Sequence, residues 1–261
     1  MARIALGLEY NGSAFCGWQS QTGGCAVQDA VEAALAQIAG EKVTLTAAGR
    51  TDSGVHALAQ VAHFDSRADR PASAWVRGAN ALLPPDVAIL WAHEVAGDFH
   101  ARFSAIERCY RYLLLNTAVR PALYKNHVGW FHQPLDVGVM REAAKLLLGK
   151  HDFSAFRAAE CRARTPVKEL RRVEITRQQD LIMFEFCADA FLHHMVRNIV
   201  GCLGYVGSGR CTAQWLGEVL QSRDRSRAAP TFSAAGLYLS GVRYDAKWRI
   251  ADFNRTMLLF P

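Results

Sequence analysis

The sequence contains no apolar run that reaches the roughly 18 residues a membrane-spanning helix needs. Its seven cysteines include no C-x-x-C pair, so neither a zinc site nor a thiol-redox site is indicated. Neither a Walker loop nor a dinucleotide-binding glycine motif is present. Glu9 stands where a signal peptide would have its apolar core, and no cleavage signature follows. We therefore expect a cytoplasmic protein that contacts no membrane and holds no metal, with most cysteines acting as small buried hydrophobic residues.

Positive charge is concentrated in the second half of the chain. Residues 1–105 hold 7 Lys and Arg against 10 Asp and Glu, a net charge of −3, and residues 106–261 hold 23 against 14, a net charge of +9. One run contains six of these basic residues, namely Arg157, Arg162, Arg164, Lys168, Arg171 and Arg172. Such a run suits a polyanion, because each phosphate it neutralises releases counterions. A solvated charged surface explains it equally well, so charge alone leaves both interpretations open.

Apolar residues recur at two spacings, every second residue in strands and every third or fourth in helices. The expected strands are 3–10, 43–48, 58–65, 87–95, 108–115, 167–176, 181–187 and 237–244, and the expected helices are 27–39, 73–82, 137–148, 191–206 and 212–221. Asp189 is the expected N-cap of the helix that starts at 191. Hairpin-like strand pairs predict an α+β fold with a mostly antiparallel sheet flanked by helices.

We divide the chain near residue 105 into two α/β halves that share a cleft. Residues 1–105 form the N-terminal half, which carries the loop around Asp52. Residues 106–261 form the basic C-terminal half, which is the one expected to contact RNA.

The most informative segment is 48–57, Ala-Gly-Arg-Thr-Asp-Ser-Gly-Val-His-Ala, between two expected strands. Arg50 and Asp52 are two residues apart, so in an extended chain both side chains project to the same side. A neighbouring guanidinium keeps a carboxylate ionised and oriented, as a nucleophilic carboxylate requires. Asp-Ser-Gly is also a common turn sequence, so the residues alone leave a catalytic and a turn interpretation open. We take His56 as structural or RNA-contacting rather than as a general base.

Three features of the second half bear on function. Tyr110 lies on an expected strand, where the pattern alone indicates an ordinary core or edge aromatic residue. Arg197 lies off the apolar stripe of helix 191–206, beside His193 and two glycines, and is either a surface residue or approaches a partner closely. Adjacent histidines such as His193 and His194 point about 100° apart on a helix, so they do not readily share a metal ion.

Several sequence blocks occur in one order over nearly the whole chain. They are 9–12 with 15 and 17–19, 49–57, 99–104, 108–112, 149–153, 191–199 and 236–239. Together they resemble the TruA family of tRNA pseudouridine synthases, whose signature matches segment 49–57. Each block is weak alone, and their shared order carries the resemblance.

The resemblance implies a pseudouridine synthase-like fold and a role for each matching residue. Asp52 is then the catalytic nucleophile, Arg197 pairs with its carboxylate, and Tyr110 stacks on the target uracil. The other residues implied to contact the substrate are Arg50, which helps to extrude the base, Leu237, in the apolar wall of the pocket, Arg102 and His193.

The implied reaction converts uridine to pseudouridine at positions 38, 39 and 40 of the tRNA anticodon stem-loop. The family acts as a homodimer and needs no metal or organic cofactor. Whether Asp52 attacks the ribose or the uracil ring stays open. The alternative is a non-catalytic basic RNA-binding protein, which would have no use for an aspartate flanked by arginine and two glycines. A hydrolase that uses Asp52 alone would normally need a second carboxylate nearby, and none is evident.

Two departures from the family pattern concern the ends of the chain. Asn11 stands where the family commonly has aspartate, and segment 230–235, Pro-Thr-Phe-Ser-Ala-Ala, replaces a commoner Pro-Thr-Ala-Pro-like run before Gly236. The apolar tail Met257–Pro261 packs against either a partner subunit or the core, and the sequence does not choose between them.

Overall fold

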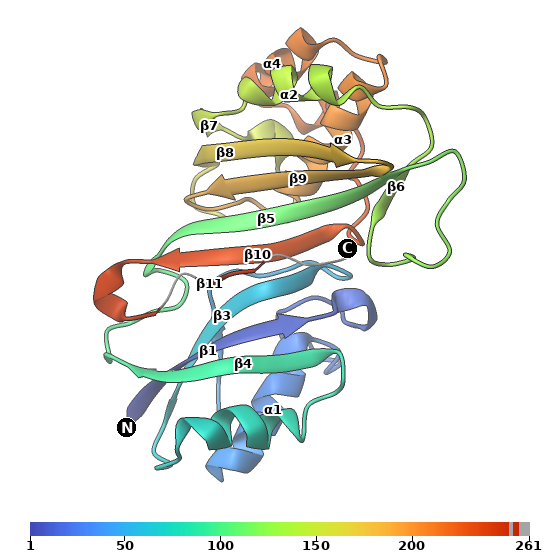
Figure 1. The fold of residues 1–261 in the computed structure, drawn as a ribbon. Helices are drawn as coiled ribbons and strands as arrows, with labels where there is room; N and C mark the ends of the chain where they lie inside the picture. Colours follow the sequence, from blue (N-terminus) through green and yellow to red (C-terminus); the bar gives the residue numbers. More distant parts are fainter. Residues whose placement is uncertain (251–252, 256–261) are drawn as a thin grey trace. The chain divides into compact units, whose positions relative to one another are not determined.

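The computed structural model describes residues 1–250 and 253–255, and the chain divides into two compact units (Figure 1). Unit 1 comprises Met1–Glu107 with the described residues from Tyr238 onward, and unit 2 comprises Arg108–Leu237. The sequence prediction divided the chain near residue 105 and placed the last strand in the second half, whereas that strand belongs to unit 1. The neighbour of a strand in a sheet is determined by tertiary packing, and the order of the strands along the chain does not reveal that neighbour. The tail Met257–Pro261 lies outside the described residues.

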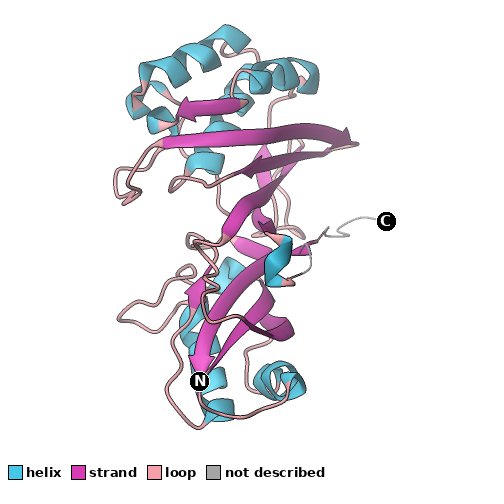
Figure 2. Ribbon diagram, turned by 90° about the vertical axis from the view of Figure 1, so that its left-hand side faces the viewer, coloured by secondary structure: helices cyan, strands magenta, loops and turns pink. Residues whose placement is uncertain are grey.

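The sheet of unit 1 is built around β1 (Ala2–Tyr10), which starts near the N-terminus labelled in Figure 2. β1 pairs antiparallel with β3 (His56–Ser66) on one side and with β4 (Val87–Val95) on the other. Residues 4–8 of β1 are all buried, as expected of a central strand that is apolar on both faces. The remaining strands are β2 (Thr46–Ala47), antiparallel to β3, and β10 (Leu237–Tyr244), which is parallel to β3 and pairs with β11 (Phe253–Asn254).

Helix α1 (Val27–Ala39) has the bounds that the apolar spacing predicts. It ends at Gly40, whose φ of 68° is the left-handed conformation that commonly terminates a helix. Its first backbone N–H groups donate to the carbonyls of Gly17 and Trp18, both at 3.1 Å. The helix therefore fixes the segment before it, which in turn contacts the Asp52 loop. Its fully buried aliphatic residues are Val27, Val31 and Leu35.

Unit 2 contains an antiparallel sheet in the order β5-β9-β8-β7. The predicted hairpin is confirmed as β8 (Val167–Gln178) and β9 (Leu181–Ala188). Phe184 and Phe186 of β9 are fully buried and, as alternate residues of a strand, point to the same face. The other strands are β5 (Ala105–Asn116), which begins in unit 1, β7 (Gly149–Asp152) and β6 (Gly129–Phe131), which is parallel to the end of β5.

Helices α2 (Val137–Lys145), α3 (Met195–Gly207) and α4 (Ala213–Ser222) cluster on one side of strands β7–β9 (Figure 1). The predicted N-cap of α3 is wrong. The helix begins after His194, whose φ is 63°, and the carboxylate of Asp189 instead accepts backbone N–H groups of β8 and of the next residue. The apolar stripe predicted for α3 is confirmed by the buried side chains of Met195, Ile199, Leu203 and Val206.

The fold class is confirmed as α+β with a mostly antiparallel sheet, and two further element predictions need correction. The strand expected at 43–48 shortens to β2, because only Thr46 and Ala47 pair with β3. The helix expected at 73–82 contains a π-helical turn at Ala74–Gly78. Among the described residues, none of the helices is long and apolar enough to cross a bilayer.

Four of the seven cysteines form disulfides, which corrects the expectation that most are isolated hydrophobic residues. Cys16 pairs with Cys25 across a separation of nine residues. Cys109 pairs with Cys187, which lies directly opposite it in the β5–β9 register. The other three cysteines match the expectation more closely, with Cys161 and Cys202 buried and Cys211 half-buried.

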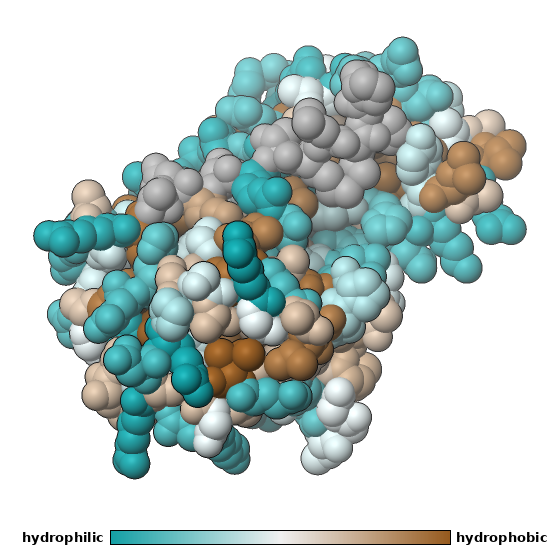
Figure 3. Space-filling view, turned by 60° about the horizontal axis from the view of Figure 1, so that its bottom comes forward, coloured by the Kyte–Doolittle hydropathy of each residue, from teal (hydrophilic) through white to brown (hydrophobic). Residues whose placement is uncertain are grey.

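Hydrophobic side chains at the surface are dispersed rather than continuous on the face drawn in Figure 3, where small brown groups stand among polar residues. The most exposed large apolar side chains outside the N-terminus include Phe103, at 75% exposed, and Leu123, at 91%.

Candidate active site

Asp52 lies in a loop that connects two strands of unit 1. The backbone N–H of Ala48 donates to Val61 of β3 at 2.7 Å, and the N–H of Val55 donates to the carbonyl of Asp52 at 3.1 Å. Gly54 has a φ of 75° within this turn, which favours glycine. Asp-Ser-Gly therefore does form a turn, and the turn leaves Asp52 half-buried and Arg50 exposed. The turn and the catalytic interpretation are compatible, because the turn presents the carboxylate.

The segment before α1 forms hydrogen bonds with the Asp52 loop. The N–H of Trp18 donates to the carbonyl of Thr51 at 3.0 Å, and the hydroxyl of Ser53 donates to the carbonyl of Phe15 at 3.2 Å. Gly17 has a φ of 100°, and a Cβ at this position would lie 2.7 Å from the Thr51 carbonyl oxygen. Only glycine fits both conditions. The disulfide Cys16–Cys25 closes the same segment on itself.

His56 is part of the fold of unit 1, in agreement with its interpretation as a structural residue. Its side chain is 1% exposed, and Nδ1 accepts the backbone N–H of Gly12 at 3.1 Å. Its ring stacks on Tyr238, with 4.6 Å between centroids. A ring that is enclosed on these sides has little access to a substrate.

Tyr110 and Tyr112 of β5 occupy different surroundings. Tyr112 is fully buried, and its hydroxyl donates to the carbonyl of Ser233 at 2.8 Å, so it is a core residue. Tyr110 is 9% exposed and meets the edge of the Phe191 ring at 5.0 Å between centroids. Tyr110 therefore lies beside the segment that leads into α3.

Arg197 is oriented by a hydrogen bond to the backbone of the segment before β10. Its Nε donates to the carbonyl of Phe232 at 2.8 Å, and the side chain is half-buried. A Cβ at Gly201, one turn further along, would lie 2.6 Å from the Pro230 carbonyl oxygen, so the small residue admits this close approach. The neighbouring Asn198 is fully buried and accepts a hydrogen bond from the hydroxyl of Thr231 at 2.8 Å. Arg197 is thus not an ordinary solvated arginine.

Two further residues predicted to contact the substrate, Leu237 and His193, lie in unit 2. Leu237 is buried at the start of β10, next to Gly236, whose carbonyl accepts the N–H of Leu113 at 2.8 Å. His193 is exposed, and its ring centroid lies 4.0 Å from that of His194. The expectation that these two rings point apart is wrong, because both residues precede α3 rather than lying on it.

Arg102 lies in unit 1, on an exposed turn. Its guanidinium is 5.6 Å from the ring centroid of Phe103, and its backbone N–H donates to Nδ1 of His100 at 3.2 Å. Unit 1 therefore holds Arg50, Asp52 and Arg102, and unit 2 brings Tyr110, His193 and Arg197 together around the start of α3.

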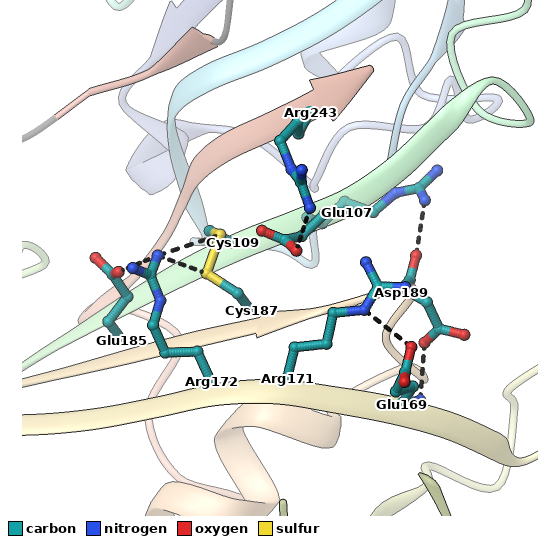
Figure 4. Close-up of polar contacts among 10 residues, drawn as sticks. Glu107, Cys109, Glu169, Arg171, Arg172, Glu185, Cys187, Asp189 and Arg243 are labelled. Atoms are coloured by element: carbon teal, nitrogen blue, oxygen red, sulfur yellow. Dashed lines mark hydrogen bonds and ion pairs between the residues drawn. A yellow bond between two sulfur atoms is a disulfide. The ribbon is translucent and has the colours of Figure 1, made fainter. Parts of the chain in front are cut away.

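Some basic residues of the run 157–172 form ion pairs or hydrogen bonds within the protein, and some are exposed. Figure 4 shows Arg171 directed at Glu169, and Arg172 directed at Glu185 beside the disulfide Cys109–Cys187. The nitrogen–oxygen distances of these two ion pairs are 2.9 Å and 2.6 Å. Lys168 is buried and donates to backbone carbonyls. Internal pairing thus accounts for part of the run. Arg162 and Arg164 are exposed, as is Arg171 despite its ion pair, so these side chains are accessible to an anionic partner.

Comparison with known proteins identifies the family. A family model described as tRNA pseudouridine synthase matches residues 7–104 and 143–245, which is most of the chain. The chain belongs to the tRNA pseudouridine synthase family. The TruA resemblance noted in the sequence blocks is thereby confirmed.

Curated members of the family match this chain over almost its full length. The tRNA pseudouridine synthase A of Thiobacillus denitrificans is 61% identical over 97% of both chains. Proteins of the same name from Chromobacterium violaceum and Nitrosomonas europaea are 60% and 56% identical, over 95% and 97% of this chain and 95% and 93% of their own. A solved H/ACA RNP bound to a substrate RNA aligns at a TM-score of 0.38 and 11% identity, over 77% of this chain and 43% of that one. The alternative of a non-catalytic RNA-binding protein is not favoured by the curated matches.

Proposed function

We propose that this protein isomerises uridine to pseudouridine in tRNA, at positions 38, 39 and 40 of the anticodon stem-loop. Membership of the synthase family and 61% identity to a tRNA pseudouridine synthase A support the reaction. The observation that carries the proposal is Asp52, a half-buried carboxylate on a loop that is fixed by hydrogen bonds on both flanks. A nucleophile held in one orientation reacts faster than one that must first be ordered.

The reaction breaks the bond between ribose C1′ and uracil N1 and forms a bond between C1′ and C5. N1 gains a proton and C5 loses one, so atoms balance and no electrons are exchanged. Asp52 is the nucleophile in this scheme, attacking either C1′ or the uracil ring, and it is regenerated at the end. The base must first leave the stack, which costs a few kcal/mol.

We assign the other family roles to the matching residues of this chain. Tyr110 stacks on the extruded uracil, Leu237 contributes apolar wall, and Arg197 stabilises the Asp52 carboxylate. The bond from Arg197 Nε to Phe232 supports this assignment, because it fixes the direction of the guanidinium. The residues that contact the RNA around the target are Arg50, which helps to extrude the base, Arg102 and His193; all three are exposed.

Position mapping tests the proposed substrate. Purified protein is incubated with an unmodified tRNA that carries uridine at 38, 39 and 40, and pseudouridine is mapped chemically along the product. We expect pseudouridine at these positions and none when they are replaced by cytidine. Pseudouridine elsewhere would contradict the site assignment, and salt-dependent tRNA binding without any pseudouridine would favour the RNA-binding alternative.

We also propose that the chain forms a homodimer and acts in the cytoplasm, on the basis of the family resemblance. Sedimentation equilibrium should then give a molar mass twice the 28.8 kDa of one chain. Sedimentation at the mass of a single chain, at the concentrations used for the activity measurement, would overturn the dimer.

A further inference from the structure

A buried hydrogen-bond network lies beneath the Asp52 loop, entirely within unit 1. The hydroxyls of Tyr10, the last residue of β1, and Thr51 are 2.8 Å apart. The side-chain amide of Gln60, from β3, donates to the carbonyl of Gly49 at 2.8 Å and lies 3.5 Å from the Tyr10 hydroxyl. The network therefore reaches the loop on both sides of Arg50, at the residues that lead directly to Asp52.

A glutamine at position 60 leaves a buried side-chain oxygen without a hydrogen bond among the residues that the structure describes. Its side chain is fully buried in β3, and its Oε1 has no hydrogen-bond partner within the described part of the chain. An unsatisfied buried oxygen costs about 1–3 kcal/mol, whereas leucine would fill similar space without that cost. The amide is thus explained by the two contacts of its nitrogen, to Gly49 and Tyr10.

Tyr10 connects the two ends of the network. Burial raises the pKa of its hydroxyl well above the usual value, so the group keeps its proton through the neutral range. With the Gln60 amide donating to it, the Tyr10 hydroxyl is free to donate to Thr51 Oγ1. The carbonyl of Thr51 also accepts the backbone N–H of Trp18, so its backbone and its side chain are each fixed by a different segment of unit 1.

We propose that Tyr10 and Gln60 are positioning residues for Asp52, acting through Gly49 and Thr51 to set the direction in which the loop presents the carboxylate. The proposal rests on the proposed role of Asp52 as nucleophile. Neither residue touches the substrate in this scheme, so their loss changes the chemical step rather than the binding of tRNA. A misplacement of about 1 Å is enough to slow a reaction by about 100-fold.

A double-mutant cycle tests the proposal. Tyr10→Phe removes only the hydroxyl, and Thr51→Val removes its partner at nearly constant volume. We expect each variant to lower kcat by 10- to 100-fold, with KM for tRNA within about twofold of the wild type, and the double variant to be no slower than the slower single one. Thr51→Ser, which keeps a hydroxyl, should restore most of kcat.

Tyr244→Phe is the matched control, because Tyr244 is also buried in unit 1 and donates one hydrogen bond, to the Ala101 carbonyl at 2.7 Å. It should lose comparable thermal stability and keep its kcat. An unchanged kcat in Tyr10→Phe, or strict additivity in the cycle, overturns the positioning role if wild type is active and Asp52→Asn is not. An inactive wild type, or an active Asp52→Asn, instead overturns the proposed function on which the inference rests.

Discussion

Gly17 shows how one residue controls the site without taking part in the chemistry. Its φ of 100° is a conformation that side-chain-bearing residues rarely adopt, and a Cβ there would lie 2.7 Å from the Thr51 carbonyl oxygen. Gly23, six residues later in the same segment, is exposed and would place its Cβ no closer than 4.0 Å to a neighbouring heavy atom. The two glycines therefore form a natural pair for comparison.

We expect Gly17→Ala to displace the Asp52 loop and to cost about 1–3 kcal/mol of stability. Activity on tRNA, as kcat/KM, should fall by at least tenfold, and the melting temperature should fall by several degrees. Gly23→Ala should leave both quantities near wild-type values. Wild-type activity in Gly17→Ala would show that the approach of this segment to Thr51 does not position the loop.

Single residues differ in how far the sequence predicts their place. Asp52 and its turn follow from Asp-Ser-Gly between two strands, and Gly54 does adopt the left-handed conformation. The network of Tyr10 and Gln60 was not foreseen, because periodicity gives burial but not hydrogen-bond partners. A polar Gln60 amid the apolar residues of β3 was the available signal. The roles of Tyr110 and Arg197 stay predictions.

At the scale of elements, strong periodicity with a clear terminator predicted bounds well. Helix α1, strand β4 and strand β10 have the predicted limits, and α1 ends at Gly40 as a glycine-terminated helix should. Helix α3 starts later than predicted, because His194 adopts the left-handed conformation and the helix cannot extend back through it. The short strands β6 and β7 were missed, since three or four residues carry too little periodicity to recognise.

The two disulfides could not be predicted from the spacing of the cysteines. Cys16 and Cys25 close the segment that contacts the Asp52 loop, and Cys109 and Cys187 join β5 to β9. Scattered spacing predicted isolated cysteines, because pairing depends on which strands and turns lie together in the fold.

At the scale of the whole molecule, the chain leaves unit 1 within β5 and returns to it within β10. The first crossing follows Glu107, and the return depends on the pairing of β10 with β3, which chain order alone does not reveal. The proposed site residues are divided in the same way, with Asp52 in unit 1 and Tyr110 and Arg197 in unit 2. Substitutions that act through unit 1 alone therefore test the nucleophile without altering the residues assigned to hold the base.

The most direct test measures tritium release from tRNA that carries 5-³H-uridine, because the proposed reaction removes the proton at C5. Wild-type protein is compared with Asp52→Asn and with Asp69→Asn, a matched change at an exposed aspartate of the same unit. We predict release by wild type and Asp69→Asn, a rate at least about 10³-fold lower in Asp52→Asn, and nearly unchanged tRNA affinity in all three. Tritium release by Asp52→Asn, in protein shown by mass spectrometry to be free of deamidation, would contradict the assignment of Asp52 as nucleophile.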